Sequence, residues 1–286
     1  MLTMLAESPA LYMSAIFILS LLVGSFLNVV IYRLPVMMKN DWQDQIDYHV
    51  NGPEHVVSRP PFNLVKPDST CPKCSHKIRA WENIPVLSWL FLRGKCSQCK
   101  TSISIRYPAV ELTTALLSTL VAYQLGFGLF GFSFVLCTWL LVAMTFIDLD
   151  EMLLPDVLTL SMLWIGLLVA AHEPTVNTTD AIVGGALGYL SLFSVYWGFK
   201  LLTGKEGMGH GDFKLLAAIG VWTGWQHLPI VILLSSVVGA IIGIALMLSK
   251  NKGRDYSIPF GPYLAVAGFI TVLYGQNIAD WYISSL

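Results

Sequence analysis

Long apolar runs alternate with short polar stretches along most of the chain, and this pattern predicts transmembrane helices. A membrane-spanning helix needs roughly 20 mostly apolar residues. Runs of this kind are separated by turn-forming residues such as Gly126 and Pro229, and Pro155 stands at a helix start. The pattern therefore predicts eight spans, at residues 10–33, 107–125, 128–147, 155–172, 180–203, 212–225, 228–249 and 257–280.

Composition agrees with this interpretation. Of the 286 residues, 55% are hydrophobic and 12% charged, and the mean hydropathy is +0.64. A soluble domain carries roughly 25% charged residues, so a purely soluble fold, a disordered chain and a disulfide scaffold are excluded. The net charge of −1 leaves no basic surplus for binding nucleic acid. We expect an all-α polytopic membrane protein that contacts lipid and no nucleic acid.

The basic residues predict the orientation of the spans, because cytoplasmic loops are enriched in Lys and Arg. Eleven of the 17 fall between Arg33 and Arg106, and the other six are Lys200, Lys205, Lys214, Lys250, Lys252 and Arg254. Eight alternating spans place all of them on one side. The N-terminus, the 173–179 loop and the C-terminus are then expected outside. The first span lacks a basic start and a cleavage site, so we expect it to stay attached.

Three parts follow from this topology. We expect a first transmembrane helix at 1–33, a cytoplasmic insert at 34–106, and a seven-helix membrane domain at 107–286. The insert is too small and too polar to bury a generous core, so another form of stabilisation is expected.

Two CxxC pairs in the insert supply that stabilisation. They are separated by 21 residues, a spacing that lets four thiolates surround one tetrahedral zinc ion. Disulfides are the alternative, but a cytoplasmic location disfavours them. The metal ligands are predicted to be Cys71, Cys74, Cys96 and Cys99, holding a structural zinc with no open coordination position. Cys137 lies within a span and is interpreted as a small core residue.

Two carboxylates lie at the predicted inner edge of the membrane. Asp148 follows the apolar run 140–147, and Asp212 opens the sixth span. Ionisable groups at such positions are costly and often functional. Two neighbouring carboxylates can share one proton, so that one activates water while the other protonates a leaving amine. The alternative is that they cap helices, which suits Asp156 better.

The sixth span is short. From Asp212 to Trp225 it would measure about 21 Å at 1.5 Å per residue, against a hydrocarbon core of roughly 30 Å. Gly207, Gly209 and Gly211 would permit a non-helical approach within the membrane, which is tolerated where it is buried or lines a wet cavity. A flexible surface turn is the alternative interpretation of these glycines.

Several motifs together resemble the bifunctional type IV prepilin peptidases, also called leader peptidase/N-methyltransferases. The resemblance covers most of the chain and is specific in the order and spacing of its motifs. They lie at Gly24–Pro35, the cysteine pairs with His76, Trp81 and Asn83–Val86, Arg106–Pro108 with Glu111, Phe146–Asp148 to Leu154–Asp156, Gly209–Lys214 and Pro259–Pro262.

The resemblance implies an eight-span GxGD-type intramembrane aspartyl protease of the bacterial inner membrane, with Asp148 and Asp212 as the catalytic pair. Such enzymes cut the basic leader from prepilins and pseudopilins of type IV pili and type II secretion. They cut on the cytoplasmic side, just before the hydrophobic helix. They then methylate the new N-terminal amine with S-adenosylmethionine.

The methyl-donor site cannot be assigned in the same way. The sequence has no Rossmann GxGxxG after a predicted strand. The family associates methyl transfer with the segment 24–33 and the insert, where Asn28, Arg33 and Glu111 are weak candidates for binding the donor. Asn28 could equally bridge helices, and Arg33 could anchor the chain at the interface.

Three other functions remain open. The two aspartates could relay protons or bind a cation in a transporter, although transporter sites usually lie near the membrane midplane and the chain lacks paired repeats. The chain could be a zinc-stabilised scaffold without catalysis, or a peptidase that lacks methyltransferase activity.

Overall fold

The computed structural model describes residues 2–52, 59–173, 177–250 and 258–285. Within these ranges its regular secondary structure is helical and contains no strand. Lys252, Arg254 and part of the 173–179 loop lie outside the described residues. The chain divides into two compact units. The N-terminal unit is Ala10–Leu120, and the bundle unit is Val121–Leu286 together with Met1–Pro9.

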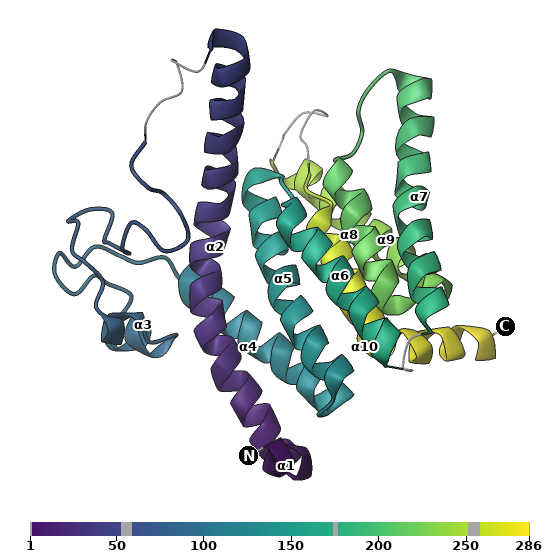
Figure 1. Ribbon diagram of the computed structural model, residues 1–286, viewed down its shortest axis with the longest axis horizontal. Helices are drawn as coiled ribbons and strands as arrows, with labels where there is room; N and C mark the ends of the chain where they lie inside the picture. The colour runs from purple at the N-terminus through teal and green to yellow at the C-terminus, as the bar shows by residue number, and fades with distance from the viewer. Residues whose placement is uncertain (1, 53–58, 174–176, 251–257, 286) are drawn as a thin grey trace. The chain divides into compact units, whose positions relative to one another are not determined.

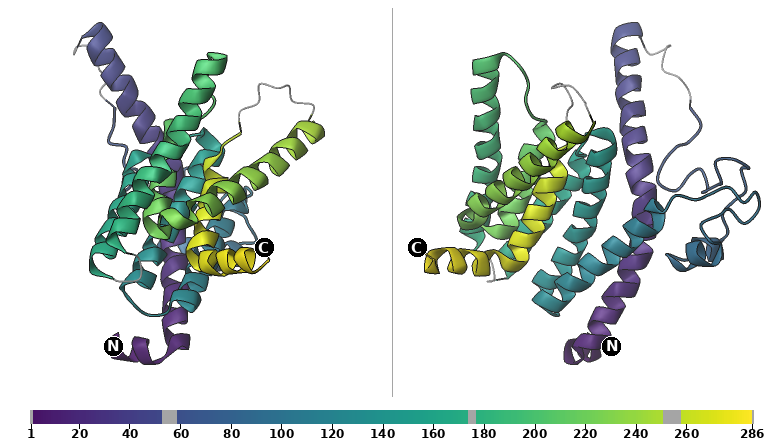
Figure 2. Two further views of the ribbon diagram at one scale, coloured as in Figure 1. Left: turned by 90° about the vertical axis from the view of Figure 1, so that its right-hand side faces the viewer. Right: turned by 180° about the vertical axis from the view of Figure 1, so that it is seen from behind.

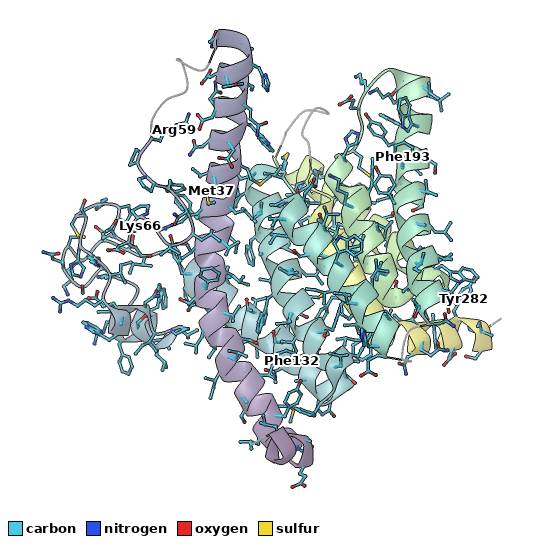
Figure 3. The ribbon with its side chains drawn as sticks, in the orientation of Figure 1. Met37, Arg59, Lys66, Phe132, Phe193 and Tyr282 are labelled. Carbon is cyan, nitrogen blue, oxygen red and sulfur yellow. The ribbon has the colours of Figure 1, made fainter. Side chains whose placement is uncertain are left out.

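The first long helix, α2 (Pro9–Asn51), is longer than the apolar run that predicts it (Figure 1). It continues from residue 33 into the expected insert and contains Pro35. A proline removes one backbone hydrogen bond, but the polar residues that follow are mostly compatible with a helix until Gly52, whose φ of 91° ends it. Arg59, labelled in Figure 3, donates to the backbone oxygen of Asn40 at 3.2 Å and so holds the returning chain against α2.

The rest of the N-terminal unit consists of short helices and turns, followed by the start of α4. Glycine brings the long helices together: a Cβ on Gly24 of α2 would lie 2.8 Å from Cα of Glu111 on α4. The elements are η2 (Ala80–Asn83), α3 (Leu87–Phe91) and α4 (Arg106–Leu125).

The bundle unit is made of long helices that run alternately up and down in Figure 1. In Figure 2, α10 lies between α5 and α9, and it packs against both of them and against α8. Besides the short α1 (Leu2–Glu7) and η3 (Trp225–His227), the helices are α5 (Leu129–Glu151), α6 (Asp156–His172), α7 (Thr178–Thr203), α8 (His210–Thr223), α9 (Leu228–Lys250) and α10 (Gly261–Ser284).

The short helix α8 forms the core of this unit. Nearly every residue from Asp212 to Thr223 is buried, because α6, α7 and α10 all pack against it. A Cβ on Gly188 of α7 would lie 2.6 Å from the carbonyl oxygen of Leu216, so the absence of a side chain permits the close approach of α7 and α8. On the same interface the rings of Phe193, labelled in Figure 3, and Phe213 lie 6.2 Å apart.

The expected helical class is confirmed and α4 to α10 lie within a few residues of their expected positions, whereas the first helix is longer than expected and the number of spans remains a prediction. Among the described residues, four helices are long and apolar enough to cross a membrane: Pro9–Asn51, Leu129–Glu151, Thr178–Thr203 and Trp225–Leu246. α6 is a shorter apolar helix. α8 has only 14 residues, as its sequence predicts.

Candidate active site and metal centre

Asp148 lies in the last turn of α5 and is 5% exposed. The helix ends at Met152, whose left-handed conformation (φ 51°) lets its N–H bond the backbone oxygen of Asp148 at 3.0 Å. The Asp148 side chain accepts a hydrogen bond at Oδ2 from the backbone N–H of Gly261, at 3.0 Å. A buried carboxylate on one helix is thereby held by the first residue of another, α10.

Asp212 is the third residue of α8 and is 7% exposed. Gly209 caps the helix, and its backbone oxygen accepts from the N–H of Asp212 at 3.2 Å. Helix N-termini favour negative charge, so this position suits a carboxylate. The preceding segment is not helical: α7 ends at Thr203, Gly204 turns the chain with φ 70°, and α8 begins only at His210. The segment that leads into α8 is therefore not helical, and its location within the membrane remains a prediction.

The structure brings the two carboxylates together. The C-terminal end of α5 and the N-terminal ends of α8 and α10 share one end of the bundle unit (Figure 1). Leu154 packs against the starts of both α8 and α10. A Cβ on Gly211 would lie 2.7 Å from Cβ of Leu154, and a Cβ on Gly261 would lie 3.1 Å from Cδ1 of Leu154. Asp148 is close enough to act electrostatically on Asp212. Two segments far apart in sequence thus present one pair of buried acids.

Lys214, two residues after Asp212, forms an ion pair with Asp156 on α6. Its Nζ lies 2.7 Å from both carboxylate oxygens of Asp156, the first residue of α6. The ion pair ties the first turns of α6 and α8 together. The ring of His210 lies 5.2 Å from that of Tyr196 and 5.4 Å from that of Phe213.

Gly261 is a site residue that sequence reasoning did not single out. Its backbone N–H is the donor to Asp148, and its missing side chain makes room for the carboxylate, because a Cβ would lie 2.6 Å from Oδ2. The motif Pro259–Pro262 contains it and was the available signal, but nothing in the local pattern pairs that motif with Asp148.

In the N-terminal unit the four expected cysteines form one cluster. Their sulfur atoms all lie within 4.8 Å of one another, with Cys71 and Cys99 at 3.7 Å and Cys74 and Cys96 at 3.9 Å. All are free thiols. A tetrahedral zinc with bonds of 2.3 Å separates its sulfur ligands by about 3.8 Å. The cluster therefore fits a four-thiolate metal site and excludes the disulfide alternative in this conformation.

The two halves of the cluster have the same backbone design. In the first, the N–H of Ser75 bonds the oxygen of Cys71 at 2.9 Å, and Ser75 has a positive φ of 58°. In the second, the N–H of Lys100 bonds the oxygen of Cys96 at 3.1 Å, and Lys100 has φ 60°. An isolated antiparallel bridge closes each turn, Thr70 with Lys77 and Lys95 with Ser102. Each tight turn directs two sulfur atoms to one point.

The thiols of the cluster do not ionise alike. Hydrogen bonding of Cys99 with the side chain and backbone of Thr101 lowers the pKa of Cys99 to about 6, and backbone N–H groups of Cys74 and Lys73 lower that of Cys71. The backbone N–H of His76 favours the Cys74 thiolate, but burial and the neighbouring thiols outweigh it and raise its pKa to about 12. Four thiolates together need a cation to offset their repulsion.

A polar group packs beside this cluster. His76 Nε2 lies 3.2 Å from Oε2 of Glu82 and 3.3 Å from the hydroxyl of Ser97. Glu82 also accepts from the backbone N–H of Arg79 at 2.8 Å. These contacts join the first knuckle, the turn at η2 and the second knuckle. The pKa of Glu82 is lowered, mainly by the hydrogen bond from the Arg79 N–H and to a smaller extent by Ser97 and His76.

The three candidate donor-binding residues lie along α2 and α4, and each hydrogen-bonds a different part of the N-terminal unit. Asn28 Nδ2 bonds the backbone oxygen of Tyr107 at 3.2 Å, which makes it a bridge between the helices. Arg33 is buried, with 8% exposed, and donates to the backbone oxygens of Asn63 and Pro67 at 2.9 and 2.7 Å. It holds the chain that leads to the cysteine cluster and is more than an interfacial anchor.

Glu111, the third candidate, is 7% exposed and accepts at Oε2 from the backbone N–H of Val86 at 2.7 Å. Val86 has φ 60° and ψ −50°, and the N–H of Leu87 bonds the oxygen of Pro85, so the chain makes a γ-turn there. A positive φ is strained for a β-branched residue. The buried carboxylate on α4 thus holds a strained turn just before α3.

Two family models match the chain. The bacterial peptidase A24 N-terminal domain matches residues 18–125, and the type IV leader peptidase family matches residues 134–244. The first match contains the cysteine cluster, and the second contains both buried aspartates.

Curated relatives match nearly the whole chain. A prepilin leader peptidase/N-methyltransferase of Aeromonas hydrophila is 57% identical over 277 residues, covering 97% of this chain and 96% of the relative. Proteins of the same name from Pseudomonas aeruginosa and Legionella pneumophila are 52% and 45% identical, covering 98% and 92% of this chain and 96% and 92% of the relatives. No solved structure matches the chain.

Proposed function

This chain belongs to the type IV leader peptidase family, and we propose that it cleaves the leader from prepilins and pseudopilins and methylates the new N-terminus. The single observation that carries the peptidase half is the pair of buried carboxylates, Asp148 and Asp212, gathered at one end of the bundle unit. Burying two carboxylates side by side is energetically costly, and a carboxylate that only capped a helix could do so at the surface. The buried pair is therefore better explained by a chemical function than by a structural one.

Asp148 and Asp212 are the proposed catalytic residues. They hold one proton between them, because two adjacent carboxylates cannot both ionise readily. The ionised group takes a proton from water as the water oxygen attacks the scissile carbonyl carbon, while the protonated group donates to the carbonyl oxygen. Return of a proton to the peptide nitrogen then breaks the C–N bond and releases a carboxylic acid and an amine.

Gly261 is the proposed positioning residue for this step. Its N–H occupies one oxygen of Asp148 and fixes the orientation of the carboxylate toward the space it shares with Asp212. Leu154 packs between the segments and limits how far they can separate. Geometry of this kind matters because misplacing a catalytic group by about 1 Å can cost 10²-fold in rate.

The proposed topology places this chemistry at the cytoplasmic face of the bacterial inner membrane, with both termini outside. Eight spans put all 17 Lys and Arg residues on the cytoplasmic side. The proposed parts are the first transmembrane helix at 1–33, the zinc-binding insert at 34–106 and the membrane peptidase domain at 107–286. The alternating directions of α5 to α10 support this arrangement (Figure 1).

Zinc is proposed as a structural ion held by Cys71, Cys74, Cys96 and Cys99. When bound, it would supply the positive charge that lets four thiolates lie together. Its binding would also stabilise the fold of the insert, which buries little apolar surface of its own. The matching knuckles support this role, since both turns already direct their sulfur atoms to one point.

S-adenosylmethionine is the proposed methyl donor, as the names of the relatives agree with N-methylation. Asn28, Arg33 and Glu111 remain the candidates for its site. Among them Glu111 has the strongest support, because its buried carboxylate holds the strained turn at Val86. Strain of this kind persists where the surrounding structure imposes it and is common at functional sites.

One experiment tests both activities. The protein, reconstituted in lipid, is incubated with a prepilin-like peptide and S-adenosylmethionine, and the products are analysed by mass. We expect a free leader and a mature fragment that is heavier by one methyl substitution. A mature fragment without that gain would reduce the chain to a peptidase, and an uncut peptide would refute the proposal.

A further inference from the structure

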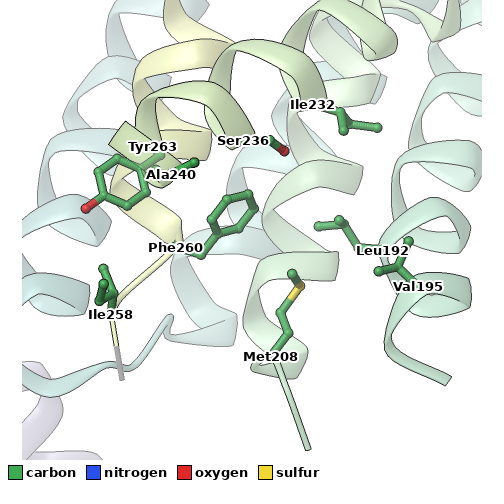
Figure 4. A pocket seen from close by; sticks show the side chains of 10 residues that line it. Leu192, Val195, Met208, Ile232, Ser236, Ala240, Ile258, Phe260 and Tyr263 are labelled. Atoms are coloured by element: carbon green, nitrogen blue, oxygen red, sulfur yellow. The ribbon is translucent and has the colours of Figure 1, made fainter. Parts of the chain in front are cut away.

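Apolar side chains border open space in both units of the chain. In the bundle unit they line a cavity of about 390 Å³ between α7, α9 and the segment that leads into α10 (Figure 4). In the N-terminal unit they lie on the outer surface of the segment 83–92, which contains α3 and has no charged residue. The exposed apolar side chains of this segment are Ile84, Leu87, Leu90 and Phe91. Such a surface is poorly solvated by water, so it requires an apolar contact.

The packing of α2 against α4 fixes the level of this segment along α2. Asn28 of α2 bonds the backbone oxygen of Tyr107 at 3.2 Å, and a Cβ on Gly24 would lie 2.8 Å from Cα of Glu111. Four residues forward on α4 thus correspond to four residues back on α2. The carboxylate of Glu111 accepts at 2.7 Å from the N–H of Val86, the residue directly before α3. The start of α3 is therefore held near the level of Gly24.

That level lies within the apolar part of α2. The apolar run of this helix ends at residue 33, nine residues beyond Gly24, which is about 13 Å at 1.5 Å per residue. One Glu side chain and one hydrogen bond together reach roughly 8 Å, so Val86 stays inside the end of the run even at full reach. In Figure 1, α3 is level with the N-terminal half of α2 and not with its polar continuation. Because α2 is long and apolar enough to cross a membrane, α3 lies at membrane depth.

The backbone of the segment suits an environment without water. Hydrocarbon offers no hydrogen-bond partner, so a chain within it must satisfy its own polar groups. Backbone oxygens of residues 84–90 accept from the N–H groups of Leu87, Ser88, Leu90, Leu92, Arg93 and Gly94. The N–H of Val86 is satisfied by Glu111, and the indole N–H of Trp89 bonds the oxygen of Ile103 at 3.2 Å. The contact of a buried carboxylate with Val86 is what a backbone at this depth requires.

Basic residues at the end of the segment indicate lipid as the partner. Arg93 and Lys95 are exposed and follow the apolar residues directly. Long basic side chains extend from apolar surroundings toward the headgroups, and anionic lipids of the inner leaflet attract them. Trp81, which is 52% exposed, precedes the segment, and tryptophan is enriched at membrane–water interfaces. An uncharged stretch of about ten residues with such flanks is typical of an interfacial or re-entrant segment.

We propose that the segment 83–92 dips into the cytoplasmic leaflet as a re-entrant anchor. Its exposed apolar side chains contact lipid acyl chains, while Arg93 and Lys95 reach the headgroups. The expected insert at 34–106 is then not wholly cytoplasmic. Its cysteine cluster is held at the membrane surface, because Cys96 directly follows this anchor. The inference requires that α2 crosses the membrane and does not depend on catalysis.

The test places the photo-crosslinking residue p-benzoylphenylalanine at single positions of the full-length protein, reconstituted in vesicles of phosphatidylethanolamine and phosphatidylglycerol. Irradiation joins this residue to whatever its side chain contacts, and mass analysis of the digested protein identifies the adduct. In place of Phe91, which is 85% exposed, it should form lipid adducts at least about ten-fold more often than in place of Val50. Val50 is the matched control, because it is apolar and 74% exposed but lies about 25 Å beyond residue 33 along α2.

Ile18 is the positive control, since it is 60% exposed within the apolar run of α2. Adducts of position 91 with peptides of the bundle unit or of a second copy would overturn the inference. Lipid adducts no more frequent than at Val50, or none at Ile18, would also overturn it. If the Phe91 variant does not fold, the same substitution of Leu90 tests the same surface. Cleavage of a prepilin-like peptide by the same preparations reports on the proposed function separately, so the two failures are distinguishable.

Discussion

The backbone N–H of Gly261 donates a hydrogen bond to Oδ2 of Asp148 at 3.0 Å, across 113 positions of sequence. The start of α10 is thereby joined to the end of α5, at the end of the bundle where α8 presents Asp212. No side chain at position 261 could replace this arrangement, because a Cβ would lie 2.6 Å from the carboxylate oxygen. The shape of the site therefore depends on a residue that itself has no reactive group.

Replacing Gly261 with Ala should displace the Asp148 carboxylate and lower prepilin cleavage by roughly 10- to 100-fold. The fold should persist, because only the site end of α10 is disturbed. Gly198→Ala on α7 is the matched control, since a Cβ there meets nothing within 4 Å. Rates of peptide cleavage at saturating and limiting substrate measure the effect. Full activity in Gly261→Ala would show that the hydrogen bond does not position the carboxylate.

Removal of zinc should loosen the cysteine cluster. Changing Cys71 and Cys96 to Ser removes one ligand from each knuckle, so metal content should fall from one ion per chain to near zero. Trypsin should then cut at Arg93 and Lys95, which lie between the knuckles. Cys137→Ala, at a buried cysteine of the bundle unit, should retain both metal and resistance. Unchanged resistance in the double variant would contradict a structural role for zinc.

The polar group of His76, Glu82 and Ser97 beside the cysteine cluster should also give a pH dependence. The pKa of Glu82 is lowered in the folded protein, so its ionised form favours folding at pH values above about 4.3, the value in an unfolded chain. This contribution is lost as the pH falls through the lowered pKa. Wild type and Glu82→Gln should therefore differ in protease resistance of the insert at pH 7 and converge near pH 3. A difference that persists unchanged at low pH would contradict this assignment.

Substitutions of Glu111 can separate a structural role from a chemical one. Gln retains an oxygen that can accept from the N–H of Val86, whereas Ala removes it. If the carboxylate only holds the turn, Glu111→Gln should methylate normally and Glu111→Ala should lose methylation. If its charge binds the methyl donor or the amine, both should lose methylation, by roughly ten-fold or more, with cleavage retained. The measurement is the methylated fraction of the cleaved product.

Local sequence pattern was sufficient to locate most of the helices and the cysteine cluster. The apolar runs placed α4 to α10 within a few residues, and the shortness of α8 was visible as 14 residues between Asp212 and Trp225. The cysteine spacing predicted the cluster because each tight turn contributes two ligands by itself. These features depend on neighbouring residues only.

Features that depend on distant residues were not predictable in this way. The apolar pattern ended the first span at 33, but a polar helix continues to Asn51, because Pro35 and the following residues do not break it. The Lys214–Asp156 pair joins residues 58 apart, and the Gly261–Asp148 bond residues 113 apart. Hydropathy carries no information about which helix ends contact each other in the fold. The family resemblance paired Asp148 with Asp212, but the contact of Gly261 with Asp148 is visible only in the fold.

Asparagine substitution of the two aspartates tests the central claim most directly. Asp148→Asn and Asp212→Asn each keep the size of the side chain and remove its ability to share a proton, so each should lower the rate of prepilin cleavage by roughly 10³-fold or more. Asp180→Asn is the matched control, because that half-buried carboxylate accepts a hydrogen bond from Trp225 near the opposite ends of α7 and α8. Cleavage near the wild-type rate in either site variant, with the protein folded, would contradict the account.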